Sequence, residues 1–160
     1  MKISVFTEDK YGPQFIKKLF LILKNKKIIN QNIILYNAHR YPVCNYKLGR
    51  MVSSALTDRD KALVLVDADG SNREDVKNST LKHIKDEDKS KTEVIVLEYE
   101  IEEWICISSD LLWKGDKPSN ILKSELKYEK YKLPDYADKL NFEKLSKSSL
   151  SFKDFLNSLK

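Results

Sequence analysis

The segment at residues 63–70, Leu-Val-Leu-Val-Asp-Ala-Asp-Gly, limits the fold more than any other part of the chain. Consecutive apolar residues that lead straight into acids are typical of a fully buried strand ending in a loop. Asp67 and Asp69 are one residue apart, and like charges this close raise each other's proton affinity unless a cation compensates them. A divalent metal is the simplest compensation. Carboxylates on a short loop suit Mg²⁺, which commonly bridges protein and substrate phosphates.

Apolar segments of strand and helix character alternate along the chain. We predict strands at residues 3–7, 32–37, 61–66 and 92–97, and helices at 13–27, 45–56, 73–85 and 101–113. This alternation predicts an α/β fold, with a mainly parallel, doubly wound sheet of about four strands and helices on both faces. Residues 1–113 form the expected core. Residues 114–160 form a helical C-terminal extension packed on the same domain, its last helix capped by Ser151.

Composition narrows the class of protein. The 160 residues suffice for one domain with a real core, and no apolar run approaches the ~20 residues that span a bilayer. The N-terminus lacks the features of a signal peptide, so we expect a cytoplasmic protein without membrane association. Cys44 and Cys106 have no metal-ligand spacing and are expected as reduced thiols. The net charge of +5 permits a polyanionic partner without requiring one.

Acidic residues follow three of the predicted strands. Glu8 follows the first strand, Asp67 and Asp69 follow the third, and Glu98, Glu100, Glu102 and Glu103 follow the fourth. Ligands of open α/β sheets collect beyond the carboxyl ends of the strands, so we expect Glu8 to approach the two aspartates. Glu98, Glu100 and Glu103 are expected to be solvated. Trp104 is expected in the core.

Glu8 after a first strand and Asp67-x-Asp69 after a third resemble the Toprim domain of topoisomerases, DnaG-type primases, recombination proteins and OLD-family nucleases. The resemblance covers about residues 1–100. It implies that Glu8 is a general acid/base and metal ligand, and that Asp67 and Asp69 coordinate Mg²⁺, with Mn²⁺ as the alternative. The chain is too short for a topoisomerase or a complete primase.

Two later motifs are similar to a small Toprim-like family related to the OLD nucleases. They are Ile101-Glu102-Glu103-Trp104 and the closing Ser151-Phe152-x-x-Phe155. In that family a glutamate precedes the tryptophan by two positions, which implies a catalytic role for Glu102. The chain departs from the pattern at Asp9, where Toprim proteins usually have glycine, and at Gly12, where many OLD-like members carry an acid. Both departures count against a complete two-metal site.

Three functions follow as alternatives. The first is a metal-dependent phosphoryl-transfer enzyme, most plausibly a nuclease on DNA or RNA, in which His39, Arg40 and Arg73 bind substrate phosphate. The second is a catalytically weak Toprim module that binds nucleic acid, another protein or a second copy of itself. The third is a receiver-type signalling domain, which the pairing of Asp67 with Asp69 disfavours because such a domain uses a single phosphoacceptor. The resemblance implies DNA repair or defence against foreign DNA as the setting for the first.

Overall fold

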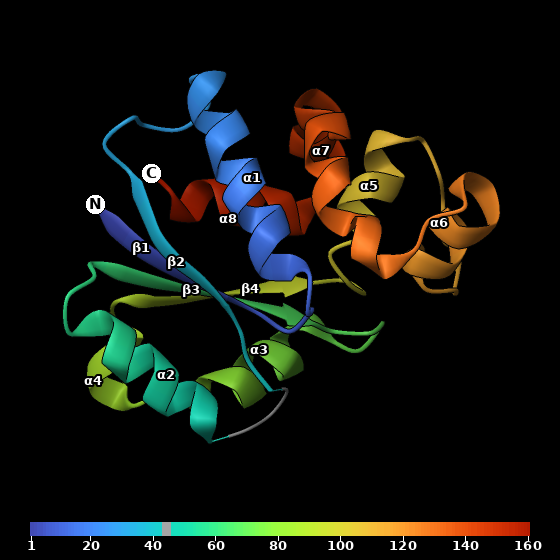
Figure 1. Ribbon diagram of the computed structural model, residues 1–160. Coiled ribbons are helices and arrows are strands. Elements are labelled where there is room, and N and C mark those ends of the chain that lie inside the picture. Colours follow the sequence, from blue (N-terminus) through green and yellow to red (C-terminus); the bar gives the residue numbers. More distant parts are fainter. Residues whose placement is uncertain (43–45) are drawn as a thin grey trace.

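A computed structural model describes residues 1–42 and 46–160 and confirms an α/β fold. Four strands form one parallel sheet in the order β2-β1-β3-β4 (Figure 1). The strands are β1 (Lys2–Thr7), β2 (Ile34–Arg40), β3 (Lys61–Asp67) and β4 (Thr92–Leu97). Because all four strands run the same way, the residues that follow them emerge at one edge of the sheet.

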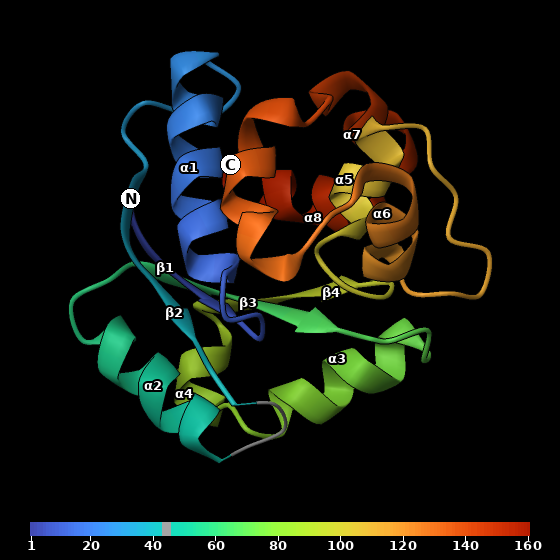
Figure 2. The ribbon, with the colours of Figure 1, turned by 45° about the vertical axis from the view of Figure 1, so that its right-hand side comes forward.

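Helices cover both faces of this sheet. One face carries α2 (Lys47–Leu56), α3 (Arg73–Leu81) and the short α4 (Asp86–Lys89). The other carries α1 (Gly12–Asn25) together with all the helices that follow β4 (Figure 2). These are α5 (Glu103–Ser108), α6 (Pro118–Leu126), the 3₁₀ segment η1 (Lys130–Lys139), α7 (Phe142–Ser148) and α8 (Leu150–Ser158).

The pleat of the central strands divides the apolar side chains between two cores. Val5 and Leu63 point into the core beneath α1, whereas their neighbours Phe6 and Val64 point into the core beneath α2. All four side chains are at most 1% exposed. Burial on both faces explains why β1 and β3 read as continuous apolar runs.

Trp104 on α5 joins the C-terminal helices to the α1 core. Its side chain is fully buried, and its ring lies 5.2 Å from that of Phe152 and 5.4 Å from that of Phe155, both on α8. The ring of Phe15, on α1, lies 6.3 Å from the Trp104 ring. The helices after residue 113 therefore help to build the same core as β1 and α1.

Several predicted boundaries were wrong. β2 runs from Ile34 to Arg40 rather than 32–37, so His39 and Arg40 belong to the strand and not to a loop. The predicted helix 73–85 ends at Leu81, with the separate α4 after it, and the helix predicted over 101–113 covers only Glu103–Ser108. The expected start of the second helix at Asn45, together with Cys44, lies outside the described residues.

The cap of the last helix also differs from the prediction. The side chain of Ser149, not Ser151, accepts the backbone N–H of Phe152, at 3.1 Å. Ser151 makes contacts inside the core instead. Cys106 is a buried free thiol, as expected. None of the helices in residues 1–42 and 46–160 has the length and apolar character needed to span a membrane.

Candidate metal centre

The loop after β3 is shaped by backbone hydrogen bonds to the segment that follows β4. The N–H of Ala68 donates to the carbonyl of Leu97, and the N–H of Gly70 donates to that of Glu98, both at 2.9 Å. Gly70 has φ +82°, and a Cβ there would come within 3.0 Å of the Tyr99 ring. The chain can therefore turn at once after Asp67, which leaves that side chain at the carboxyl edge of the sheet.

Glu8 lies beside this loop because β1 pairs with β3. A backbone hydrogen bond from Asp67 reaches its carboxylate. The Tyr41 hydroxyl lies 3.4 Å from Glu8 Oε1 and 2.9 Å from the carbonyl oxygen of Leu65. Arg40 Nε donates to the Glu8 carbonyl oxygen at 3.3 Å. The structure thus brings together Glu8 and Asp67, as the sequence predicted.

Two glutamates after β4 complete the acidic edge. Glu102 is 0% exposed, and apart from a contact with the Tyr128 hydroxyl its carboxylate makes no well-formed hydrogen bond with the described residues. Glu100 is 5% exposed and accepts hydrogen bonds from the backbone N–H of Ser119, at 3.1 Å, and from the Ser119 hydroxyl. The prediction that Glu100 is solvated was wrong: the chain turns inward after β4 and α6 closes over it.

Lys130, the first residue of η1, extends its ammonium group into this cluster. Its Nζ atom lies 3.5 Å from Asp9 Oδ2, 3.8 Å from Glu100 Oε2 and 3.7 Å from Glu102 Oε2. Burial lowers the pKa of Lys130, but the negative charges of Glu102, Glu100 and Asp9 outweigh that effect and raise it overall. Lys130 therefore stays charged. Within the described part of the chain, neither Glu8 nor Asp67 forms an ion pair.

Burial, with a smaller contribution from neighbouring negative charges, raises the pKa values of three carboxyl groups at this edge. Burial, followed by the charges of Glu8 and Glu102, raises the pKa of Asp67 to about 9. Burial raises the pKa of Glu8 to about 7, although a hydrogen bond from the backbone of Asp67 acts to lower it. Burial and the charge of Glu100 raise the pKa of Glu102 to about 8, although Lys130 opposes this. At neutral pH the cluster needs either protons or a cation.

The donor set fits a hard divalent cation that keeps part of its water. Glu8 and Asp67 supply oxygens from adjacent strands, whereas Glu102, farther along the edge, already has Lys130 as an ionic partner. Among residues 1–42 and 46–160, no group of three or more His, Cys, Asp or Glu side chains is arranged to hold a metal ion. Mg²⁺ requires no such group, because it is commonly held by one or two carboxylates with several waters.

Asp69 and the cationic residues predicted to bind phosphate take different positions. Asp69 is exposed, with Oδ1 4.0 Å from Lys117 Nζ. His39 stacks on Phe6 with 5.7 Å between the ring centroids, which places it on the face of the sheet covered by α2. Arg73 is already engaged: its Nη2 donates to Asp154 Oδ2 at 3.0 Å and to the Val96 carbonyl oxygen at 3.3 Å. Of the three cationic residues, Arg40 has a contact with Glu8.

Glu103 holds the segment that carries Glu102. Its carboxylate accepts the backbone N–H groups of Tyr99, at 2.9 Å, and Glu98, at 3.3 Å, and the Ser151 hydroxyl at 3.0 Å. It is 3% exposed, so the prediction of a solvated Glu103 was also wrong. Burial raises its pKa to about 7, while its hydrogen bonds with Tyr99, Ser151 and Glu98 oppose this. Its role is to fix the turn after β4 and so to position Glu102.

Sequence reasoning missed Asp9, Glu100, Tyr128 and Lys130 as members of the site. Asp9 stood out only as a departure from a family pattern, and the buried Tyr128 hydroxyl gave no signal. The pKa of Tyr128 is raised by burial, then by the charges of Glu102, Asp9 and Glu100, and by its hydrogen bond with Glu102. Lys130 is one of 29 lysines and arginines, and only the fold distinguishes it.

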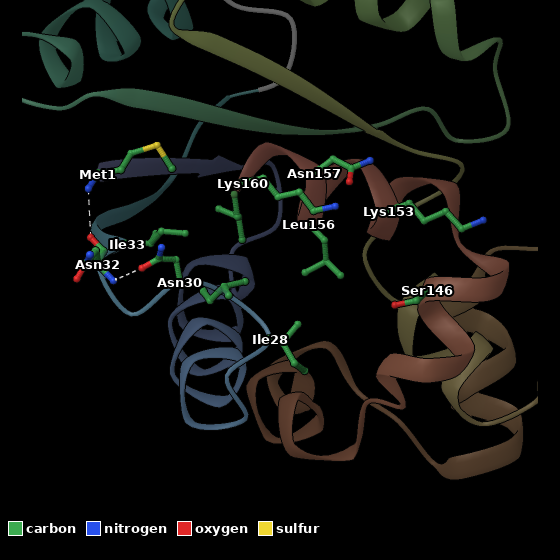
Figure 3. Close-up of a pocket in the computed structure, with 12 residues that line it drawn as sticks. Met1, Ile28, Asn30, Asn32, Ile33, Ser146, Lys153, Leu156, Asn157 and Lys160 are labelled. Carbon is green, nitrogen blue, oxygen red and sulfur yellow. Dashed lines mark hydrogen bonds between the residues drawn. The ribbon is translucent and has the colours of Figure 1, made fainter.

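A separate cavity of about 680 Å³ lies at the opposite, amino-terminal end of the sheet. Figure 3 shows Ile28, Ile33 and Leu156 turned into it, with Asn32 and Lys153 nearer its ends. No acidic side chain of the described residues lines it, so it shares nothing with the metal centre.

Comparisons with known proteins add no constraint here. No family model, no curated protein and no solved structure matched the chain. Inference about function therefore depends on the geometry of the acidic edge.

Proposed function

We propose that this chain is a Toprim-like, metal-dependent phosphoryl-transfer protein, most simply a nuclease that hydrolyses DNA or RNA phosphodiesters. The observation that supports this most directly is the pairing of Glu8 with Asp67. They come from distant parts of the chain, meet at the carboxyl edge of adjacent strands, and form no ion pair in the described part of the chain. Two partly buried carboxylates without a counter-ion do not stabilise a fold, which favours a role in function.

Each residue has a specific role in the proposed reaction. Asp67 and Glu8 would hold the metal, with the exposed Asp69 beside them, and the metal would supply charge stabilisation to the phosphodiester. Glu8 accepts a proton from the attacking water as general base. Arg40, whose Nε donates to the Glu8 carbonyl oxygen at 3.3 Å, places a guanidinium group where a substrate phosphate would arrive.

The surface next to the metal centre suits a polyanion. Lys117 lies beside Asp69, and Lys123 lines a hollow of about 280 Å³ together with Lys130. With the net charge of +5, these lysines favour contacts to a phosphate backbone that carry no sequence information.

Cleavage assays test the proposal directly. Single- and double-stranded DNA and RNA are incubated with the protein in EDTA, Mg²⁺ or Mn²⁺. We expect cleavage only with metal, lost in Asp67→Asn and lowered by roughly 100-fold or more in Glu8→Gln. Glu87→Gln, an exposed acid on α4, is the matched control and should retain activity. Metal-independent cleavage, or equal activity of all variants, would contradict the proposal.

A second function, a catalytically weak binding module, is favoured by Lys130. Its ammonium group already compensates part of the acidic cluster, as expected of a site that has lost its metal. Gly12 also favours a site without full catalytic capacity. A Cβ there would come within 2.4 Å of Thr7 Oγ1, so the acid that many OLD-like members carry at this position does not fit. This function predicts salt-sensitive binding to nucleic acid with no turnover in any metal.

A further inference from the structure

The acidic edge has two halves that differ in how their charge is compensated. Glu8, Asp67 and Asp69 form the open half. Asp69 is 4.0 Å from the exposed Lys117, and the other two have no ion pair in the described part of the chain. Asp9, Glu100 and Glu102 form the closed half, and one ammonium group serves all three.

The placement of Lys130 in the closed half is that of a central counter-ion. Its Nζ lies between 3.5 and 3.8 Å from an oxygen of each carboxylate, at nearly equal distances. Only the contact to Asp9 is within hydrogen-bond range. A cation placed in this way acts through charge on the whole group of oxygens, as a metal ion does, and not through one directed bond.

Glu102 is the most deeply buried member of the closed half. Its side chain is 0% exposed, and apart from a contact with the Tyr128 hydroxyl its carboxylate makes no well-formed hydrogen bond with the described residues. Burying a carboxylate with so few hydrogen bonds is costly, so its charged form depends on a nearby cation. Lys130 Nζ, 3.7 Å from Oε2, is the charge that faces this group.

The chain also holds Lys130 in place from its N-terminal side. Tyr128, two residues earlier, is 2% exposed, and its ring packs against that of Tyr136 at 5.4 Å. The side chain of Lys130 remains 57% exposed, so it enters the cluster from the solvent side. The backbone is thus anchored, while the ammonium group stays close to water and to an incoming substrate.

We propose that the Lys130 ammonium group is the resident second cation of this site, so that the protein binds a single divalent ion, in the open half. The inference rests on the proposed function, because it concerns the same metal centre. It assigns the charge of Lys130 to the closed half and the divalent ion to Glu8 and Asp67.

Mn²⁺ titration tests this without any substrate. Bound and free Mn²⁺ are separated by their electron paramagnetic resonance signals in the wild type, Lys130→Met, Lys130→Arg and the control Lys26→Met, an exposed lysine at the far end of α1. We expect one Mn²⁺ per chain in the wild type, Lys130→Arg and Lys26→Met, and two in Lys130→Met. Adding Glu102→Gln to Lys130→Met should abolish the second site.

The outcomes separate this inference from the proposed function. Two ions in the wild type, or one ion in both the wild type and Lys130→Met, overturns the inference and leaves the metal-dependent function standing. No bound ion in the wild type overturns both. If Lys130→Met does not fold, the wild-type and Lys130→Arg stoichiometries still decide, because two ions in either contradict a resident ammonium cation.

Discussion

The Ser151 hydroxyl donates a hydrogen bond of 3.0 Å to Glu103 Oε2, and this contact links the last helix to the turn after β4. The same Ser151 oxygen accepts the indole N–H of Trp104 at 2.9 Å. One buried hydroxyl therefore satisfies two side chains that flank the acidic edge. The position of Glu102, the residue before Glu103, depends on α8, which is more than forty residues away in the chain.

Ser151→Ala should destabilise the protein by about 1–3 kcal/mol, because it leaves the buried indole N–H without an acceptor and removes a donor to Glu103. Urea unfolding followed by tryptophan fluorescence measures the change. Ser148→Ala, an exposed serine at the end of α7, is the matched control and should change stability little. Equal stability of the two variants would show that the contact is not important to the fold.

Gly12→Ala should destabilise the protein by about 1–3 kcal/mol, because the new methyl group would come within 2.4 Å of Thr7 Oγ1. Removing the obstacle in Thr7→Ala should make the same change less costly. We therefore expect a double-mutant cycle, measured by urea unfolding, to show a favourable coupling between the two substitutions. Simple additivity would mean that β1 and α1 can move apart without cost.

The metal-free protein should become more stable as the pH falls from about 9 to about 5. The pKa values of Glu8, Asp67 and Glu102 are raised from 4.5, 3.8 and 4.5 to about 7, 9 and 8, so the folded state binds more protons than the unfolded state between these limits. This contribution to stability is fully present below the unfolded pKa values and is lost as the pH rises through the folded ones.

Thermal unfolding in EDTA and in Mg²⁺ across this pH range measures the effect. Mg²⁺ should raise Tm more at pH 8 than at pH 5.5, because protons compete for the same carboxylates. Asp67→Asn should be more stable than the wild type in EDTA at pH 8, and less responsive to Mg²⁺. A flat Tm in EDTA from pH 5 to 9 would show that the pKa values of these carboxyl groups are not raised in the folded state.

Lysines beside the metal centre should contribute to nucleic-acid affinity, whereas lysines at the other end of the sheet should not. The slope of log K against log salt concentration reports how many phosphates the protein neutralises. We expect the double substitution Lys117→Gln and Lys123→Gln to make this slope shallower by about two. Lys26→Gln with Lys27→Gln, at the C-terminal end of α1, makes the same change of charge as a control. Fluorescence anisotropy over 50–200 mM salt gives both slopes, and equal slopes for the two pairs would place binding elsewhere.

The local sequence was sufficient for much of the fold. Strands with continuous apolar runs, such as β3 and β4, were predicted to within a residue because burial on both faces leaves no ambiguity. β2 was displaced because Ile34 and Tyr36 are about half exposed, so the apolar pattern no longer marks the strand. The apolar run around Trp104 overstated the length of α5 because apolar residues beyond it pack without being helical.

The candidate site was predictable only where chain order determines proximity. Glu8 and Asp67 follow neighbouring parallel strands, so their approach follows from topology. Glu100 and Glu103 were misjudged because their burial depends on α6 and α8, whose packing no local pattern encodes. The position of Lys130 depends on how the chain returns across the site after α6, which is a property of tertiary structure alone.

The close approach of Gly70 to Tyr99 has a consequence for natural variation. The loop after β3 and the segment after β4 are hydrogen-bonded so closely that a Cβ at position 70 would come within 3.0 Å of the tyrosine ring. Positions 70 and 99 should therefore covary during evolution. A bulkier residue at position 70 should occur only where position 99 has become smaller.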